Sequence, residues 1–165
     1  MMPFHRCLGV TLGHEGGDTL TDHAQDPGGL TRWGISQTAY PDVDIRTLTR
    51  EGAAALYERD YWTPLRCDEL PLGIALCVFD TGVNMGVKAA VRLLQATVGG
   101  EVDGVFGPRT LAAVYRYPPD RLIRRFSTER AQRYMALGGF QTFGRGWIAR
   151  TIDVAVTAAE WGVED

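Results

Sequence analysis

A glutamate followed by two glycines, Glu15-Gly16-Gly17, is the first place in this chain where residue types and spacing suggest chemistry. Apolar residues precede the glutamate at helical spacing, which predicts a helix with Glu15 at the end of its apolar face: Phe4, Leu8 and Leu12. The glycines can end that helix in the left-handed conformation without a Cβ clash. An inward-facing carboxyl group at the negative end of a helix dipole resists ionisation. We therefore predict that Glu15 is a general acid, against the alternative of a surface glutamate at a frayed helix end.

The stretch after the glycines carries groups that could complete such a site. Asp26 comes just before the turn signal Pro27-Gly28-Gly29, and Thr31 lies two residues before the strand-like run 33–36. An acid that protonates a glycosidic oxygen needs a second carboxylate, or a polar pair that holds the attacking water, across the scissile bond. We predict a β-hairpin packed against the helix end, with Asp26 and Thr31 orienting or activating water.

Candidate substrate contacts follow from what a sugar chain requires, which is flat apolar surfaces and hydrogen-bonding groups. Trp33, Tyr61 and Trp62 are candidates for the flat surfaces, with core packing as the alternative for each. The polar candidates stand on otherwise apolar helices, where they line a groove or satisfy hydrogen bonds with neighbouring loops: Asp80, Asn84 and Gln95.

The elements that must position these residues are mostly helices. Thr49 is a predicted N-cap, and residues 71–85 are apolar on nearly all sides, which indicates a central helix. Met135, near the end of the helix predicted over 120–137, is expected to face the core. The last predicted helix carries the apolar residues Trp147, Ile148, Ile152, Val156 and Ala159. The predicted helices cover residues 3–15, 50–59, 71–85, 87–98, 110–115, 120–137 and 143–161. The fold class is therefore mainly α, with a small β-hairpin beside the end of the first helix.

Length and composition are consistent with a single domain over residues 1–165 that can bury a core. The net charge of −3 does not favour nucleic-acid binding. Basic residues concentrate after Arg109, either on solvated helix faces or on a surface that meets an anionic polymer.

Three cysteines without paired spacing, Cys7, Cys67 and Cys77, are predicted to be reduced and buried. No secretory signal and no membrane-spanning run is recognised, so synthesis in a cytoplasm and no stable membrane association are expected. A monomeric state is also expected.

Several segments together resemble glycoside hydrolase family 108, a family of N-acetylmuramidases found mainly as phage endolysins. The first block is the most specific, and the match covers nearly the whole chain. The similar segments are Glu15-Gly16-Gly17, Asp26-Pro27-Gly28-Gly29-Leu30-Thr31, Gly34-Ile35-Ser36, residues 79–86, Leu94-Gln95, residues 102–110 and Gly146-Trp147-Ile148-Ala149-Arg150. The resemblance implies a lysozyme-like fold, with a catalytic half at 1–86 and a helical peptidoglycan-binding-like half at 87–165.

The resemblance also implies roles. The conserved acid of the family falls on Glu15, whereas Asp18 stands where the family often has an aromatic residue. By analogy with phage-type lysozymes, Asp26 and Thr31 would position water for an inverting attack. The implied reaction is cleavage of the β-1,4 bond between N-acetylmuramic acid and N-acetylglucosamine in peptidoglycan glycan strands. The implied setting is a phage or prophage endolysin that waits in the cytoplasm until a holin releases it to the periplasm and cell wall.

Other functions remain open from the sequence alone. A lytic transglycosylase also uses a lone glutamate but forms a 1,6-anhydro end, and a chitinase-like hydrolase differs only in its sugar pocket. A non-catalytic wall-binding module would rest on residues 103–110. A metallopeptidase would have to use ligands without an H-E-x-x-H motif: His14, Asp18, Asp22 and His23. The favoured reading requires no metal and no cofactor.

Overall fold

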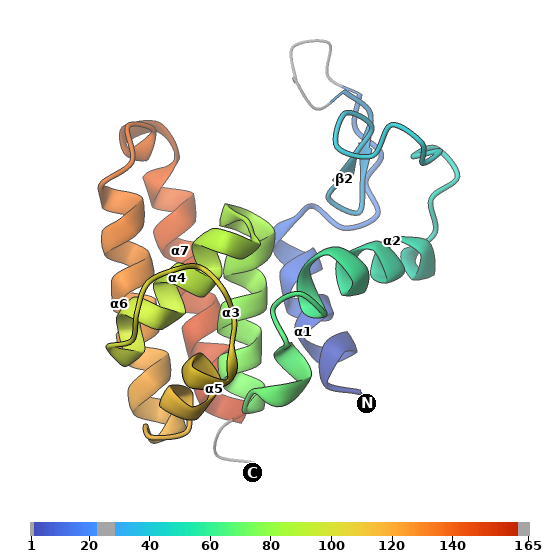
Figure 1. The fold of residues 1–165 in the computed structure, drawn as a ribbon. Helices are drawn as coiled ribbons and strands as arrows, with labels where there is room; N and C mark the ends of the chain where they lie inside the picture. Colours follow the sequence, from blue (N-terminus) through green and yellow to red (C-terminus); the bar gives the residue numbers. More distant parts are fainter. Residues whose placement is uncertain (1, 23–28, 162–165) are drawn as a thin grey trace. The chain divides into compact units, whose positions relative to one another are not determined.

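A computed structural model of the chain describes residues 2–22 and 29–161. Its contacts divide the chain into two compact units, Met1–Asp60 and Tyr61–Asp165 (Figure 1). Within the described residues, no helix is both long and apolar enough to cross a membrane. The three cysteines, all in the part of the chain that the structure describes, are reduced and buried, as predicted.

The first unit combines two helices with a short antiparallel hairpin. Helix α1 spans Pro3–His14 and begins with proline, which suits a first-turn position because its missing N–H would have no partner there. Strands β1 (Thr31–Arg32) and β2 (Ile35–Ser36) pair with Thr31 opposite Ser36. Helix α2 spans Arg50–Tyr57, and the predicted cap is confirmed because Thr49 Oγ1 accepts a hydrogen bond of 3.1 Å from Gly52 N.

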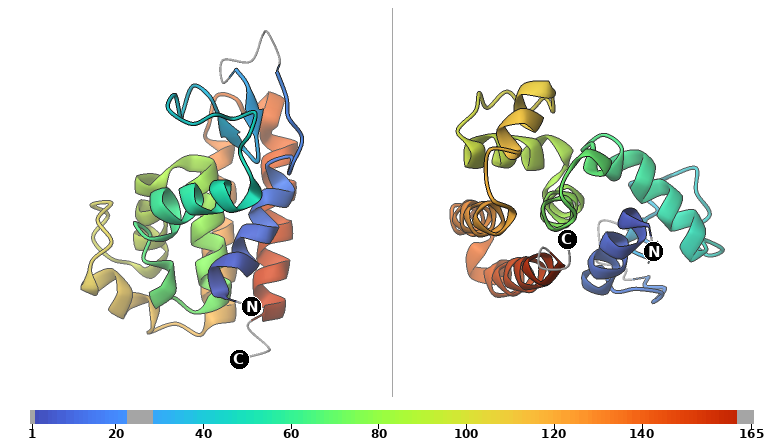
Figure 2. Two further views of the ribbon diagram at one scale, coloured as in Figure 1. Left: turned by 90° about the vertical axis from the view of Figure 1, so that its right-hand side faces the viewer. Right: turned by 90° about the horizontal axis from the view of Figure 1, so that it is seen from below.

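The second unit is a helical bundle. A π-helical turn, Glu58–Trp62, crosses the boundary between the units, and a short 3-10 helix covers Cys67–Glu69. The main helices are α3 (Leu72–Met85), α4 (Val87–Val98), α5 (Pro108–Val114), α6 (Pro119–Met135) and α7 (Phe140–Trp161). Helix α3 contacts α4, α6 and α7, and the end-on view of Figure 2 shows it beside them.

Nearly all residues of α3 are buried, so α3 is the central helix of the bundle, as its all-round apolar pattern predicted. Small residues allow close approach of its neighbours. A Cβ on Gly73 would lie 2.5 Å from the carbonyl oxygen of Ala158 on α7 and 3.0 Å from Cδ1 of Ile123 on α6. The three helices thus meet at a position that only glycine fits.

Two expectations for the bundle are wrong, the burial of Met135 and the start of α7. Met135 was expected to face the core but is 60% exposed, because it ends α6 where the chain turns toward α7. On α7 the apolar residues Ile152 and Val156 are more than half exposed, and the buried residues are Gly144, Arg150, Thr151, Val154 and Ala158. Helix α7 also begins at Phe140, three residues before the predicted start at 143. The expected class, mainly α with one small hairpin, is confirmed for the described residues.

Candidate active site

Glu15 is the first residue after α1, where the helix ends in a Schellman-type turn. Gly16 has φ of +85°, and Gly17 N donates a 3.2 Å hydrogen bond to Leu12 O. This is the bond that closes a helix end with glycine at the left-handed position. The glycine pair therefore ends the helix as predicted and leaves the Glu15 side chain half-buried at its end.

The Glu15 side chain packs against the turn of the hairpin at Gly34. A Cβ placed on Gly34 would lie 2.8 Å from Cβ and 3.2 Å from Cγ of Glu15, and 2.5 Å from the hydroxyl oxygen of Tyr57. Gly34 also has φ of +72°, which side chains rarely adopt. The Tyr57 hydroxyl donates a 3.0 Å hydrogen bond to Trp33 O, which fastens the same turn to α2. Glycine at position 34 is thus required both by backbone conformation and by the closeness of the candidate acid.

The turn between β1 and β2 consists of Trp33 and Gly34, both with positive φ, as in a type I′ hairpin. Trp33 N donates a 3.0 Å hydrogen bond to Gly17 O, and its indole Nε1 donates one of 3.2 Å to Leu48 O. The hairpin is therefore tied to the glycine pair that ends α1. The predicted packing of a hairpin against the helix end is what the first unit shows.

Thr31 lies on β1, half-buried, two residues before this turn. Its backbone exchanges two 2.9 Å hydrogen bonds with Thr21, and its Oγ1 donates a 3.2 Å hydrogen bond to Gly29 O. Asp26, and most of the turn predicted at 26–29, lie outside the described residues. The water-positioning roles of Asp26 and Thr31 stay predictions.

Asp18, which stands where an aromatic was expected by resemblance, is an ion-pair partner of the hairpin. Arg32 Nη2 lies 2.7 Å from Asp18 Oδ1, and Arg32 Nη1 donates a 3.1 Å hydrogen bond to Arg46 O. Asp18 thus helps to hold β1. Among the described residues, no three His, Cys, Asp or Glu side chains gather in a way that could hold a metal ion, and His23 lies outside those residues.

The aromatic candidates differ in accessibility. Trp33 and Tyr61 are half-buried, so each keeps some surface for a ligand. Trp62 is 1% exposed and packs edge-on against Phe79, with ring centroids 5.5 Å apart. A sugar cannot reach a ring buried to this extent. Trp62 is therefore a core residue, which was the alternative reading of this side chain.

Asp80 is fully buried on α3, where it was a candidate groove residue. Nη2 of Arg130 lies 2.7 Å from one carboxylate oxygen and Nη2 of Arg150 lies 2.7 Å from the other. Burial alone would raise the pKa of Asp80, but hydrogen bonds from Arg150 and the charges of both arginines outweigh it and hold the pKa below its usual value. Asp80 is therefore the ionised centre of a buried Arg–Asp–Arg cluster rather than a sugar contact.

Asn84 lies one turn beyond Asp80, and its Oδ1 accepts a short hydrogen bond from the Tyr134 hydroxyl. The Tyr134 ring stacks on Trp147, with centroids 5.0 Å apart and planes inclined by 20°. Asn84 itself is exposed and remains a candidate for substrate contact through its amide N–H groups.

Gln95 is 2% exposed and organises the loop before α5. Its Nε2 donates hydrogen bonds to Asp103 Oδ1 at 2.7 Å and Val105 O at 3.1 Å, and its Oε1 accepts one of 2.8 Å from Gly104 N. The side chain thus shapes the segment that resembled wall-binding modules, and its burial leaves no surface for a sugar.

The sequence reading missed the roles of Tyr57, Arg130 and Arg150. Tyr57 lies on the helix that follows the Thr49 cap, and nothing local in the sequence shows that its hydroxyl reaches the hairpin. Arg150 was visible only within the Gly-Trp-x-x-Arg resemblance. In the structure the tryptophan and arginine of that motif, Trp147 and Arg150, contact Tyr134 and Asp80.

Comparisons with known proteins agree with this layout. The sequence model of the family described as "Glycosyl hydrolase 108" matches residues 8–86, and that of "Predicted Peptidoglycan domain" matches residues 89–152. No curated protein matches the chain.

Among solved structures, the chain is similar to SagA of Brucella abortus, with 34% sequence identity and a TM-score of 0.85 over 96% of this chain and 95% of that chain. The similarity confirms the lysozyme-like fold class. The two family models meet between residues 86 and 89, whereas the compact units meet after residue 60, and the predicted functional division at residue 86 stays a prediction. On these matches the chain belongs to glycosyl hydrolase family 108, and its second part matches the model of a predicted peptidoglycan domain.

Proposed function

We propose that the protein is an N-acetylmuramidase that hydrolyses the β-1,4 bond between N-acetylmuramic acid and N-acetylglucosamine in peptidoglycan. The observation that supports this most is the placement of Glu15 at the end of α1, half-buried and in van der Waals contact distance of the hairpin turn at Gly34. Membership of the family supports glycoside hydrolysis as the reaction class. The match of residues 89–152 to a peptidoglycan domain supports peptidoglycan as the polymer.

In the proposed reaction, Glu15 gives its proton to the glycosidic oxygen as the bond from that oxygen to the anomeric carbon breaks. A water oxygen bonds to the anomeric carbon from the opposite ring face. Asp26 takes the proton of that water, and Thr31 helps to orient it. The cut leaves a reducing N-acetylmuramic acid and a free hydroxyl on N-acetylglucosamine, and solvent returns the proton from Asp26 to Glu15.

Substrate contacts come from the candidates that keep accessible surface. Trp33 and Tyr61 would offer ring faces, and Asn84 would offer amide hydrogen bonds. Trp62, Asp80 and Gln95 are not part of the proposed contact set, because each is at most 2% exposed.

Product analysis of digested, purified sacculi tests the proposal. Borohydride reduction followed by mass spectrometry should find reduced N-acetylmuramic acid at the new ends, with one water added per cut. New 1,6-anhydro ends would show a lytic transglycosylase instead. Reduced N-acetylglucosamine ends would show that the other glycosidic bond is cut. Sacculi that bind the protein but gain no new ends would identify a binding module.

We further propose that the enzyme serves as a phage or prophage endolysin, an expectation that rests on the resemblance to that family. Expression inside a bacterial host should then cause lysis only when the inner membrane is also permeabilised, for example by a co-expressed holin. Lysis at the same rate without permeabilisation contradicts this role.

A further inference from the structure

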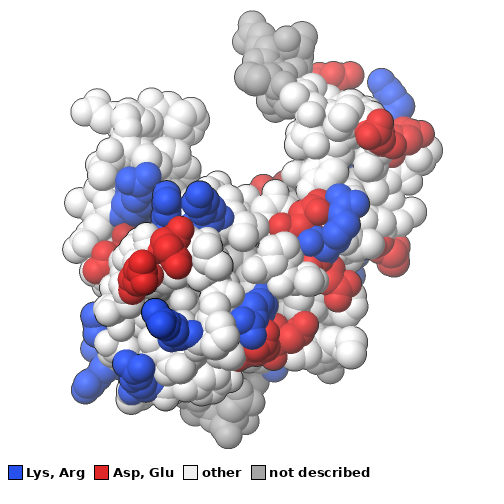
Figure 3. Space-filling model, viewed as in Figure 1, with Lys and Arg blue, Asp and Glu red and all other residues white. Residues whose placement is uncertain are grey.

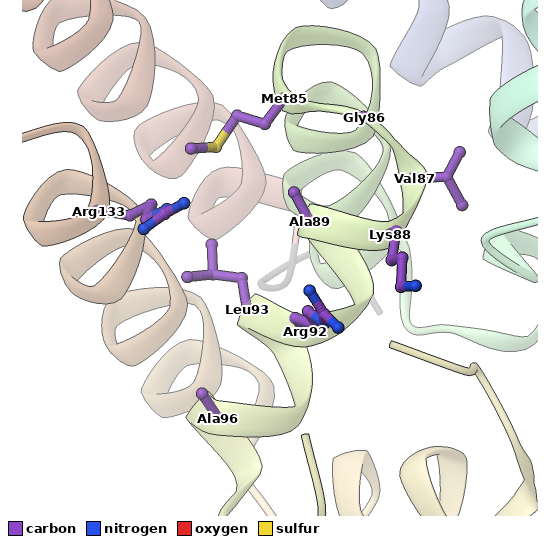
Figure 4. A pocket seen from close by; sticks show the side chains of 9 residues that line it. All are labelled: Met85, Gly86, Val87, Lys88, Ala89, Arg92, Leu93, Ala96 and Arg133. Carbon is purple, nitrogen blue, oxygen red and sulfur yellow. The ribbon is translucent and has the colours of Figure 1, made fainter. Parts of the chain in front are cut away.

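A groove of about 720 Å³ runs along α4 in the second unit, and none of its lining residues is among the candidate site residues described above. Figure 4 shows its lining residues, which come from the end of α3, from α4 and from α6. Met85 and Leu93 point toward Arg133 across the space between α4 and α6 in this view. The groove is a feature of the bundle alone, because all its lining residues belong to that unit.

The apolar side chains that line the groove, which we call its floor, are small or flexible: Met85, Val87, Ala89, Leu93 and Ala96. No aromatic ring lines it within the described part of the chain. A sugar ring prefers a flat aromatic face, so this floor suits short aliphatic groups better than a glycan.

Three cationic side chains also line the groove: Lys88, Arg92 and Arg133. No carboxylate lines the groove, and none of the three forms an ion pair, within residues 2–22 and 29–161. Figure 3 shows Lys and Arg side chains gathered on this part of the bundle, with Asp and Glu side chains directly beside them.

The cationic groups on α4 are partly held in place by the loop before α5. A Cβ on Gly104 would lie 2.9 Å from Cγ of Lys88 and 3.2 Å from Nε of Arg92. The pKa of Asp103 is lowered first by hydrogen bonds from Val105 N and Gln95, and Arg92 adds a smaller charge effect. Stems packed in this way lose less freedom when their charged heads meet an anion.

We propose that this groove binds the stem peptides of peptidoglycan through their carboxylates. The glycan strand is uncharged where its lactyl groups are amide-linked to peptides, whereas each stem peptide carries free carboxylates between alanine methyl groups. The carboxylates match Lys88, Arg92 and Arg133, and the methyl groups match the aliphatic floor. The inference rests on the proposed function, because the occupant is part of the same polymer.

On this proposal the two parts of the chain have different roles. Glu15 in the first unit acts on the sugar backbone, and the groove on α4 binds the peptides attached to that backbone. Binding at the groove would then depend on salt, because its contacts are exposed charges.

A soluble stem peptide tests the groove without any glycosidic bond. The probe is a fluorescently labelled tetrapeptide of L-Ala, γ-linked D-Glu, meso-diaminopimelate and D-Ala, titrated with the full chain while fluorescence anisotropy is measured. The double variant Lys88→Ala/Arg133→Ala should bind roughly tenfold more weakly, since each exposed charge contact contributes up to about fivefold. A probe with its carboxylates amidated should lose binding to a similar degree.

Arg121→Ala/Arg124→Ala is the matched control. It removes the same charge from exposed positions near the other end of α6, outside the groove lining. Its dissociation constant should stay within about twofold of wild type. An equal loss in the control, no binding by wild type, or undiminished binding of the amidated probe overturns the proposal. Stronger binding of a polyphosphate chain than of the peptide also overturns it, since it points to a phosphate polymer as the occupant.

Hydrolysis of sacculi by the wild type, measured in parallel, separates the two proposals. New reducing ends without peptide binding would refute the proposal of peptide binding at the groove and support that of muramidase activity. Peptide binding without new reducing ends would refute the muramidase and keep the groove.

Discussion

Glu15 in the first unit and Asp80 in the second are both carboxyl side chains carried by helices, but their surroundings differ in kind. Glu15 is half-buried beside a turn shaped by glycines, and its side chain packs against Gly34 of that turn. Asp80 is fully buried between two arginine side chains that keep it ionised. The comparison shows that two acids on apolar helix faces can have quite different surroundings, and we expect those surroundings to decide whether each serves chemistry or packing.

The largest loss of stability is expected from Asp80→Asn. This change leaves two buried guanidinium groups without their counter-charge, which costs roughly 3–5 kcal/mol in the free energy of unfolding. Urea denaturation measures it. Glu160→Gln, at an exposed site on α7, is the control and should change stability by less than about 0.5 kcal/mol. A loss for Asp80→Asn no larger than the control would mean that the Arg–Asp–Arg cluster contributes little to the fold.

A smaller loss of stability, with a large loss of activity, is expected from Gly34→Ala. The added Cβ meets Glu15 and Tyr57, and the backbone has positive φ, so about 1–3 kcal/mol is lost. Displacing the acid by about 1 Å should lower the rate of sacculus hydrolysis roughly 100-fold. Gly9→Ala on α1 is the matched control: nothing lies within 4 Å of its Cβ, and alanine there should stabilise the helix by up to about 1 kcal/mol. If both variants hydrolyse sacculi equally well, Gly34 does not position the acid.

Acidification should produce a smaller effect still, and mainly through the second unit. The pKa of Asp80 is lowered in the folded chain, so the unfolded chain takes up this proton first as pH falls. The stability supplied by the carboxylate is therefore present above the unfolded pKa of about 3.9 and is lost below it, by at most about 1.4 kcal/mol per pH unit. Unfolding midpoints at pH 6, 4 and 3 measure it, and Asp80→Asn should flatten the fall. An unchanged pH profile in that variant assigns the acid sensitivity to other groups.

The smallest effect concerns two buried thiols, one in each unit. Burial raises the pKa of the Cys77 thiol to about 12, and α3 is surrounded by other helices. Cys7 lies in the smaller unit, where fewer helices cover α1, so local opening should expose it more often. Native-state alkylation at pH 8, followed by peptide mass spectrometry, should label Cys7 before Cys77. The reverse order would show that the bundle opens more easily than the first unit.

The fold was predictable wherever the signal was local. Helical periodicity bounded by glycine or proline placed α3 within one residue and α4 at its observed bounds, and the Thr49 cap was read from its residue type. The buried face of α7 was not predictable. That face includes Arg150, whose partner Asp80 is 70 positions away, whereas the apolar residues Ile152 and Val156 are exposed.

The candidate site was predictable in part for the same reason. The Glu15-Gly16-Gly17 helix end is a local pattern, and the structure shows it. The turn that contacts Glu15 was not recognised at Trp33 and Gly34, because tryptophan rarely adopts the positive φ that it has here. The contact of Gly34 with both Glu15 and Tyr57 joins three separate segments, and no single stretch of sequence carries that information.

The most direct test of the central claim is the rate of sacculus hydrolysis by Glu15→Gln, with the thermal unfolding midpoint measured on the same sample. The glutamine keeps the size of the side chain and removes the proton donor, so the rate should fall by roughly 10²–10⁴-fold while the midpoint stays within a few degrees of wild type. A variant that still hydrolyses sacculi at close to the wild-type rate would contradict the assignment of Glu15 as the general acid.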